Sequence, residues 1–249
     1  MSIMTDNMQI GMDIATNQPT NQPKRVLVAC EESQRVCSAF REKGHEAYSC
    51  DILKCSGGHP EWHINYSCYP LIWGNCEFMT QNGEHHKIDG AWDLIIAHPP
   101  CTYLTVSGNA HFREDRYNTK AKARWIERVN GIKFFMDFVV CNAKSIAIEN
   151  PIGIMSNVYR KPDQIIQPYE FGEHARKSTC LWLKNLPKLE PTEIVDQGEI
   201  GPDGHSVGAG MYKLKDENGK SIPYDDPRTS IIRSRTFPGI AKAMAEQWG

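Results

Sequence analysis

No run of apolar residues in this 249-residue chain approaches the length of about 18 or more that a membrane-spanning helix needs. Residues 1–22 lack a basic segment followed by an apolar stretch and are rich in Asn, Gln, Thr and Met. We therefore expect a disordered tail there, not a secretory signal. The formal net charge is only −2, so the chain is no polycation, although positive charge can still gather on one face.

The nine cysteines lack the regular spacing of a disulfide framework. Because their number is odd and no export signal precedes them, we expect reduced thiols and a cytoplasmic location. One segment is rich in Cys and His, but its spacing fits no common zinc site and holds no paired C-x2-C knuckle. Its residues are Cys55, His59, His63, Cys68 and Cys76. We expect no metal here, and interpret the segment as a loop that covers a ligand.

Short β-branched runs alternate with helical patterns through most of the chain. Strands are expected at 25–30, 46–51, 92–97, 145–148 and 179–183, and helices at 35–43, 121–142 and in the last residues through Trp248. Because strand–helix–strand crossovers imply parallel pairing, the sequence predicts an α/β fold with a doubly wound, mostly parallel sheet. Ligands bind at the carboxyl ends of the strands in such sheets.

Two stretches between these elements have distinct compositions. Residues 52–89 are expected to be irregular, and residues 187–227 to form a small loop-rich region because turn formers and charges dominate there. The helix expected over 121–142 has an apolar stripe that we interpret as core packing. The stripe consists of Trp125, Ile126, Val129, Ile132, Phe135, Met136 and Val139.

Two residues of chemical interest follow buried strands. Cys101 comes after the strand at 92–97 and two prolines, and Glu149 follows the strand at 145–148. In a parallel sheet both would lie at the same edge, where they could hold one base between them. A thiolate can add to C6 of cytosine and so activate C5, while a carboxyl group supports N3. The sequence thus predicts attack on a pyrimidine ring by Cys101 with Glu149 as the acid.

Pro100-Cys101 and Glu149-Asn150-Pro151 resemble the two catalytic signatures of the DNA cytosine-5 methyltransferases, proline-cysteine and Glu-Asn-Val. The stretch 236–241, Thr-Phe-Pro-Gly-Ile-Ala, is similar to the last motif of that family, and 171–182 resembles its Gly-Val-Pro-Gln-x-Arg-x-Arg strand. With His-Pro-Pro-Cys-Thr-Tyr at 98–103, the pattern looks most like the short phage-type branch, over about residues 25–249.

The resemblance implies a Rossmann-like methyltransferase fold, S-adenosylmethionine as cofactor, and a flipped cytosine in double-stranded DNA as substrate. It implies that Cys101 and Glu149 are catalytic. Pro100, Asn150 and Lys177 would support them. The cofactor would be bound by Cys30, Glu31, Ser33, Asp51 and Pro99. The protein would be a phage modification or restriction-modification enzyme acting as a monomer in the host cytosol.

The expected organisation is a tail over 1–24, a catalytic and cofactor-binding domain over 25–165, a small target-contacting region over 166–229, and a returning helix over 230–249. Two departures from the family's pattern stand out. The loop at 31–34 lacks the glycines of Phe-x-Gly-x-Gly, and Lys177 alone keeps a positive charge where the family has two arginines. A loop without glycine approaches a ligand less closely.

Positive charge is concentrated in two stretches that we expect to contact DNA phosphates. One follows Cys101 and the other lies near the C-terminus, where Arg228 and Lys242 also belong to it. The expected contacts are Arg113, Arg116, Arg124, Arg176, Arg233 and Arg235.

Three alternatives stay open. An amino methyltransferase for adenine N6 or cytosine N4 would use Asp/Asn-Pro-Pro-Tyr/Phe, but His98 and Cys101 occupy the first and last of those positions. The chain could be a degenerate fold kept for DNA binding. Lastly, the same thiol chemistry also suits transfer of another one-carbon group to a pyrimidine, such as hydroxymethylation, since the donor follows only from the fold analogy.

Overall fold

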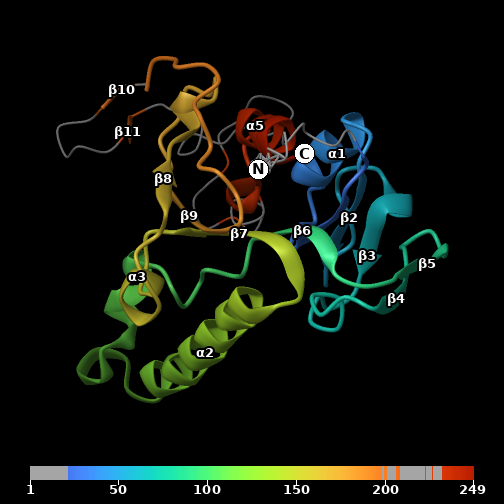
Figure 1. Ribbon diagram of the computed structural model, residues 1–249. Coiled ribbons are helices and arrows are strands. Elements are labelled where there is room, and N and C mark those ends of the chain that lie inside the picture. The colour runs from blue at the N-terminus through green and yellow to red at the C-terminus, as the bar shows by residue number, and fades with distance from the viewer. Residues whose placement is uncertain (1–21, 198, 201–205, 208–221, 223–225, 227–231) are drawn as a thin grey trace, which may run out of the picture.

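The computed structural model describes residues 22–197, 199–200, 206–207, 222, 226 and 232–249. Most of the tail expected over 1–24 lies outside these residues, as does Arg228. Figure 1 shows a central sheet with helices on both faces, which confirms the expected α/β fold with a mostly parallel sheet. None of the described helices combines the length and the apolar character that crossing a membrane requires.

The main sheet has seven strands in the order β3-β2-β1-β6-β7-β9-β8. Strands β3, β2, β1, β6 and β7 are parallel, and β9 is antiparallel to both of its neighbours. The first five positions follow the doubly wound order, in which the direction of winding reverses between β1 and β6. The bounds are β1 Arg25–Ala29, β2 Glu46–Asp51, β3 His63–Asn65, β6 Trp92–Ala97, β7 Ala143–Pro151, β8 Gln164–Ile166 and β9 Thr179–Lys184.

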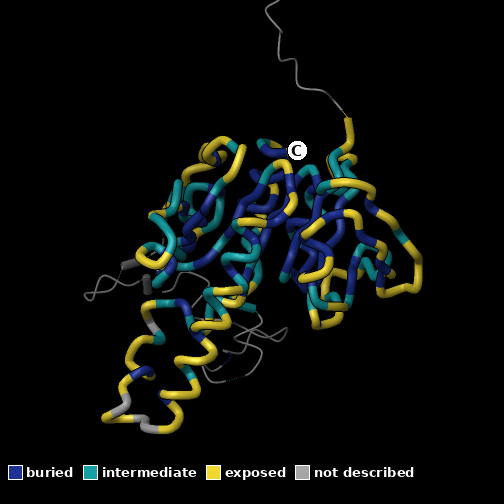
Figure 2. The backbone as a smooth tube through the Cα atoms, turned by 60° about the horizontal axis from the view of Figure 1, so that its bottom comes forward, coloured by how far each residue is buried: buried dark blue, intermediate teal, exposed yellow. Residues whose placement is uncertain are grey.

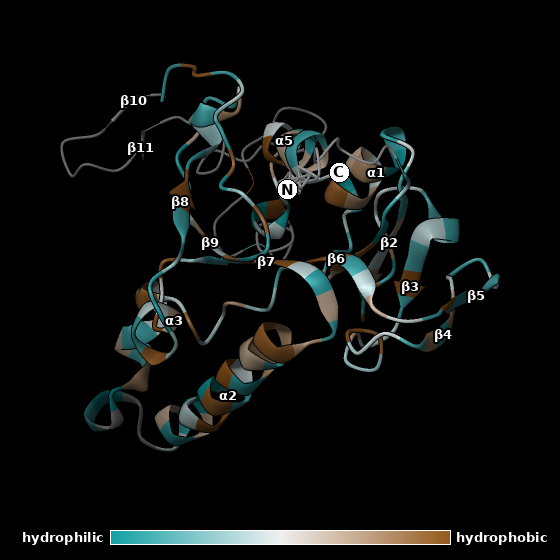
Figure 3. Ribbon diagram, viewed as in Figure 1, coloured by the Kyte–Doolittle hydropathy of each residue, from teal (hydrophilic) through white to brown (hydrophobic). Residues whose placement is uncertain are grey.

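The sheet buries both faces, as a central parallel sheet must. Side chains of one face pack against α1 (Arg35–Glu42) and α5 (Pro238–Trp248), and those of the other pack against the last turns of α2 (Glu114–Val140). In Figure 1, α1 and α5 lie above the strands and α2 below them. Polar and apolar residues alternate along both α2 and α5 in Figure 3. The result is a three-layer arrangement that leaves the carboxyl ends of the strands for a site.

The turn between β1 and α1 is stabilised by its own side chains. Cys30 and Gln34 both adopt positive φ angles, 62° and 59°, which supply the sharp turn without glycine. The carboxylate of Glu31 accepts hydrogen bonds from the backbone N–H groups of Val36 (2.7 Å) and Cys37 (3.2 Å). These groups belong to the unpaired donors at a helix start, so Glu31 takes the place that an anionic ligand could occupy.

Residues 52–89 are more regular than the sequence suggested. They hold a short 3-10 helix (Pro60–Trp62), strand β3, and an antiparallel hairpin of β4 (Cys76–Met79) and β5 (His85–Ile88). The expectation of an irregular segment was therefore wrong. Burial alternates along β4, with Cys76 and Phe78 buried, a period of two that the short strand and its polar neighbours obscured.

The apolar stripe expected along α2 is only half correct. Phe135 and Phe138 are buried in the core, but Trp125, Ile126 and Val129 are 45, 64 and 62 % exposed. The helix begins at Glu114, earlier than expected, and its first half projects with the segment before it as an arm (residues 106–130), which Figure 2 shows as largely exposed. Periodicity predicted the helix but not where the sheet beneath it ends.

The C-terminal part of the chain completes the main sheet and one helical layer. Strand β9 pairs with β7 along its whole length, although it lies in the segment 166–229 that was set apart as a small region. The target-contacting role of that segment stays a prediction. Helix α5 starts with Pro238 and buries Ile240, Met244 and Trp248 at helical spacing against the α1 side of the sheet.

Candidate functional site

His98 and Glu149 meet at the carboxyl ends of two neighbouring strands. The register pairs Ala97 of β6 with Ile148 of β7, so the next residues along the two chains, His98 and Glu149, lie side by side. Nδ1 of His98 donates a hydrogen bond of 2.8 Å to Oε2 of Glu149. Their side chains are only 9 and 14 % exposed, so this is a buried pair. A polar pair so far from water holds its geometry strongly, because either partner left alone would be costly.

The loop that carries Cys101 is tied to the loop that follows β7. The side-chain amide of Asn150 donates to the carbonyl oxygen of Pro99 (2.8 Å), and the backbone N–H of Ile154 donates to the carbonyl of Leu104 (2.9 Å). Gly153 is buried where a Cβ atom would lie 2.3 Å from the carbonyl oxygen of Leu104. Only glycine permits this close approach, so the two loops form one unit.

Asn150 was expected to support Glu149, and the contacts of its side chain are to backbone carbonyl groups. Its amide bonds the Pro99 carbonyl and, at 3.2 Å, the backbone carbonyl of Glu149 itself. The side chain that holds the carboxylate is His98. Sequence reasoning missed His98, although a titratable residue directly after a buried strand, three positions before the cysteine, was a visible signal.

Opposite charges stabilise the buried pair. Burial alone would raise the pKa of Glu149, but the hydrogen bond and charge of His98, with Lys177, outweigh it and hold the pKa below its usual value. Burial likewise works to lower the pKa of His98, while Glu149 and then Glu31 raise it above its usual value. The favoured state is an imidazolium next to a carboxylate.

Cys101 lies partly exposed within the electrostatic reach of the same groups. Burial raises the pKa of its thiol, the negative charge of Glu149 raises it further, and the ammonium of Lys177 lowers it. Lys177 is held in place by a hydrogen bond from Nζ to the backbone carbonyl of Arg233 (3.0 Å). The structure thus brings Cys101, Glu149 and Lys177 together as the sequence predicted, and makes Lys177 the group that favours the thiolate.

This balance predicts the reactivity of the thiol in the free protein. Lys177→Gln removes the stabilising cation, so alkylation of Cys101 by iodoacetamide at a given pH slows several-fold, whereas Glu149→Gln removes the opposing anion and speeds it. The measurement is mass spectrometry of the peptide that contains Cys101 over a pH series. Equal alkylation rates in both variants and the wild type would contradict the electrostatic account.

The cofactor-binding residues expected after β1 are mostly enclosed. Glu31 and Ser33 are buried, and Gly57 lies so close to this loop that a Cβ atom would be 2.6 Å from the carbonyl oxygen of Ser33. Gln34 exchanges two hydrogen bonds with the backbone of His59. The segment around Gly57 therefore packs on the loop. The glycine that the loop at 31–34 lacks is supplied by the facing segment, as Gly57.

Asp51 and Cys30 lie at the carboxyl ends of β2 and β1, beside the point where winding reverses. Burial raises the pKa of Asp51, whose Oδ1 accepts a hydrogen bond from the backbone of Leu53 (2.9 Å). Ile52 next to it is 78 % exposed, an apolar surface beside a carboxylate. The Sγ atoms of Cys30 and Cys68 are 3.9 Å apart. Asp51 with Ile52 suits a nucleoside, since a carboxylate can bind ribose hydroxyls and an apolar side chain can cover a base.

The arginines expected to contact DNA fall into three groups. Arg113 and Arg116 are exposed on the arm, where Arg113 forms an ion pair with Asp115. Arg124 lies over the rings of Tyr103 and Phe112 at 4.9 and 5.1 Å. Arg176 bonds the side chain of Gln197 and Arg235 pairs with Glu32 (3.3 Å), so both face the body of the protein, whereas Arg233 contacts Lys177 through its backbone carbonyl.

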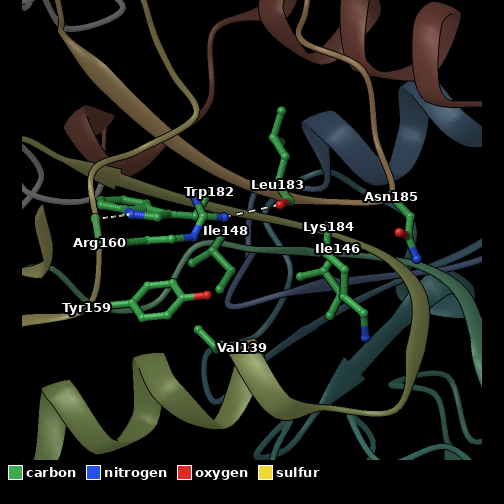
Figure 4. Close-up of a pocket in the computed structure, with 9 residues that line it drawn as sticks. All are labelled: Val139, Ile146, Ile148, Tyr159, Arg160, Trp182, Leu183, Lys184 and Asn185. Atoms are coloured by element: carbon green, nitrogen blue, oxygen red, sulfur yellow. Dashed lines mark hydrogen bonds between the residues drawn. The ribbon is translucent and has the colours of Figure 1, made fainter.

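A hollow lies on the α2 side of the sheet, between β7, β9 and the segment after α3 (Met155–Val158). Figure 4 shows that its polar groups bond one another: Trp182 donates to the carbonyl of Arg160 (2.8 Å), and Arg160 donates to that of Leu183 (3.2 Å). None of the residues predicted for the site lines it. The hollow is therefore separate from the cluster around Cys101.

The Cys- and His-bearing segment does not gather into a metal site within the described residues, which hold no group of three or more potential ligands. His63 is buried between Ser49 and the carbonyl of Leu53, and His59 stacks on Trp62 with ring centres 3.9 Å apart. These side chains have separate structural partners. Part of the segment packs on the loop after β1, and its expected role in covering a ligand stays a prediction.

No model of a known protein family matches the chain, and no curated protein matches it. Among solved structures, it is similar to an E. coli prophage protein described as a candidate DNA modification methyltransferase, at 14% sequence identity and a TM-score of 0.36. The match covers 77% of this chain and 55% of that protein, so the chain spans about half of that protein's length. A likeness this loose carries no argument, and the function must be argued from the site.

Proposed function

We propose that this chain is an S-adenosylmethionine-dependent DNA methyltransferase that acts on cytosine C5 through Cys101, with Glu149 supporting N3. The observation that carries the proposal is the joint placement of Cys101 and the buried His98–Glu149 pair at the carboxyl ends of β6 and β7. A thiol and a carboxyl group placed near each other are what attack at a pyrimidine C6 requires.

In the proposed reaction the thiolate of Cys101 forms a bond to C6 of a cytosine that has left the helical stack. The electron pair of the C5–C6 double bond shifts towards C5 as N3 gains a proton from the Glu149 side. After methylation of C5, a water molecule or base removes the C5 proton, the double bond reforms, and the bond to Cys101 breaks. Lys177 assists the first step by favouring the thiolate.

S-adenosylmethionine, when bound, supplies an electrophilic methyl group that is lost from a sulfonium centre. Asp51 would hold the ribose hydroxyls and Ile52 would cover the adenine, at the reversal point between β1 and β6. The start of α1 is not free for the carboxylate of this cofactor, because Glu31 already accepts its N–H groups. The residues present therefore fit the nucleoside part of S-adenosylmethionine and not its carboxylate.

The arm is proposed as the surface that binds DNA. It is exposed, and Arg116, Lys120 and Lys122 all present charge to solvent along α2. Arg128 is buried instead: it donates to the carbonyl of Tyr103 (2.8 Å) and lies 3.4 Å from the centre of the Phe112 ring. That residue stabilises the arm, and the exposed cations beside it are suited to phosphates.

Replacing Arg116, Lys120 and Lys122 together by glutamine is expected to weaken binding to duplex DNA and to flatten its salt dependence. Each lost phosphate contact lowers the slope of log K against log salt by about 0.9. Fluorescence anisotropy at several salt concentrations measures both effects. A control triple replacement of Lys43, Lys87 and Lys188, exposed lysines outside the arm, removes the same charge. Equal salt-dependence slopes in the two variants would show that the arm does not contact the DNA.

Of the alternatives, transfer to an amino group gains nothing from the geometry. His98 would have to accept the amino proton, but its Nδ1 already donates to Glu149. A different one-carbon donor is favoured by one observation, the enclosed loop after β1 with Glu31 at the helix start. It would leave the roles of Cys101 and Glu149 unchanged. A fold that only binds DNA predicts no bound donor in calorimetry.

The deciding experiment incubates the protein with S-adenosylmethionine that carries a labelled methyl group and with cytosine-containing duplex DNA, followed by mass analysis of the nucleosides. Label on 5-methylcytosine supports the proposal. Label on N4-methylcytosine or N6-methyladenine contradicts it in favour of an amino methyltransferase. Absence of label on every DNA tested contradicts the choice of donor and substrate.

A further inference from the structure

The His98–Glu149 pair has a feature that its role as a simple ion pair leaves unexplained. Nε2 of His98 is buried and has no hydrogen-bond partner within the described part of the chain. An unpartnered polar atom in a buried pair is costly, and such atoms concentrate where a group must change its protonation state. His98 also stands three residues before Cys101, on the loop that presents the thiol.

We propose that His98 is the positioning residue of the reaction, which orients the Glu149 carboxylate through Nδ1 and serves as the store of the proton delivered to cytosine N3. This inference rests on the proposed function and adds a residue to it. The family that the chain resembles has arginines on the strand after residue 171. Here the cation that is hydrogen-bonded to the Glu149 carboxylate is His98, which lies on the loop that carries Cys101.

As the Cys101 sulfur forms its bond to C6, negative charge moves into the ring. The Nδ1–H bond of His98 breaks, the carboxylate of Glu149 takes that proton, and Glu149 in turn gives the proton to N3. The exchange leaves a neutral imidazole, and Glu149 ends as the carboxylate it was at the start. When the Cys101–C6 bond breaks, the proton returns from N3 to the pair. No other reactant is consumed in this exchange.

The groups around His98 suit this exchange. Glu149 faces it from β7, Glu31 from the turn after β1, and Lys177 from the segment before β9. The two carboxylates favour the charged imidazole and Lys177 opposes it. With two anions nearby and one cation, the protonated form of His98 is favoured, and the positive charge that leaves His98 is transferred to the base where negative charge develops.

The test is the pH dependence of the rate at saturating DNA. The rate should depend on the Cys101 thiolate, which forms as the pH rises, and on the protonated His98, which is lost as the pH rises, so the wild-type profile should be bell-shaped. His98→Asn keeps an N–H donor close to the position of Nδ1 but cannot titrate. We expect it to remain folded, to keep KM for DNA within about twofold, to lower kcat about 10- to 100-fold, and to lose the alkaline limb. The control is His45→Asn, which should keep the wild-type pH profile because His45 precedes the amino end of β2, away from the carboxyl ends of the strands.

A second measurement does not depend on activity. Nuclear magnetic resonance of labelled histidine in the free protein should show that His98 titrates above its usual range in the wild type, and at lower pH in Glu149→Gln. A His98→Asn variant with full kcat and an intact alkaline limb overturns the role of His98 while leaving methyl transfer in place. If the wild type forms no 5-methylcytosine, the proposed function fails, and the role of His98 fails with it.

Discussion

Cys101→Ala is expected to abolish transfer to cytosine, with a residual rate at the background of the assay. In the proposed mechanism the thiolate is the group that makes C5 nucleophilic, and no other described thiol shares the electrostatic surroundings of Glu149 and Lys177 that Cys101 has. The same variant should bind DNA and unfold much as the wild type does, because Cys101 is partly exposed and alanine leaves the backbone contacts of its loop in place.

A covalent trap separates this from a loss of folding. In DNA that carries 5-fluorocytosine the final step is blocked, since fluorine cannot leave as a proton does, so the wild type should remain attached to the DNA. Cys101→Ala should form no adduct on a denaturing gel. Cys141→Ala, a buried cysteine after α2 near the start of β7, should form it normally. An adduct with Cys101→Ala would identify another nucleophile.

The second large effect is expected for Glu149→Gln. Transfer should fall by roughly two to four orders of magnitude, the usual contribution of a positioned acid or base, because glutamine cannot pass a proton to N3. The variant should also lose about 1–3 kcal/mol of stability, the cost of leaving a buried hydrogen-bonding partner without its charged acceptor. Thermal and urea unfolding measure the second effect independently of the first.

The stability lost in Glu149→Gln should depend on pH in a defined direction. The pKa of Glu149 is lowered in the folded protein, so its contribution is present above the ordinary glutamate value and disappears as the pH falls through the folded value. The pKa of His98 is raised, so its contribution is complete below the ordinary histidine value and disappears as the pH rises through the folded value. The difference in unfolding free energy should be largest between about pH 4.3 and 6.5. A difference that does not vary with pH would contradict the ion pair.

The α/β fold and the placement of Cys101 and Glu149 near the strand ends were predictable because they depend on local signals. β-branched runs, a helical period and polar residues at strand ends located β1, β6, β7 and the positions of Cys101 and Glu149. Register and packing were not predictable. The hydrogen bond between His98 and Glu149 follows from the alignment of Ala97 with Ile148, which no property of either strand alone specifies.

The arm and the loop after β1 likewise depend on packing that the sequence pattern did not predict. Trp125 belongs to the helical apolar stripe, yet it lies beyond the edge of the sheet and is exposed, so period alone overestimated the core. The enclosure of Ser33 depends on Gly57, which is 24 residues away and whose backbone fits only because it has no side chain. Contacts between distant segments decide such cases.

The bonds that join the Cys101 loop to the segment around Gly153 also bear on the entropy of the reaction. In the proposed mechanism these contacts hold Cys101 and Glu149 relative to each other before a base enters, so the two loops lose little conformational freedom on binding. The entropic cost of reaching the reactive arrangement then belongs to the DNA, whose nucleotide must leave the stack. Substrates in which the cytosine is mismatched or weakly stacked should accordingly react faster.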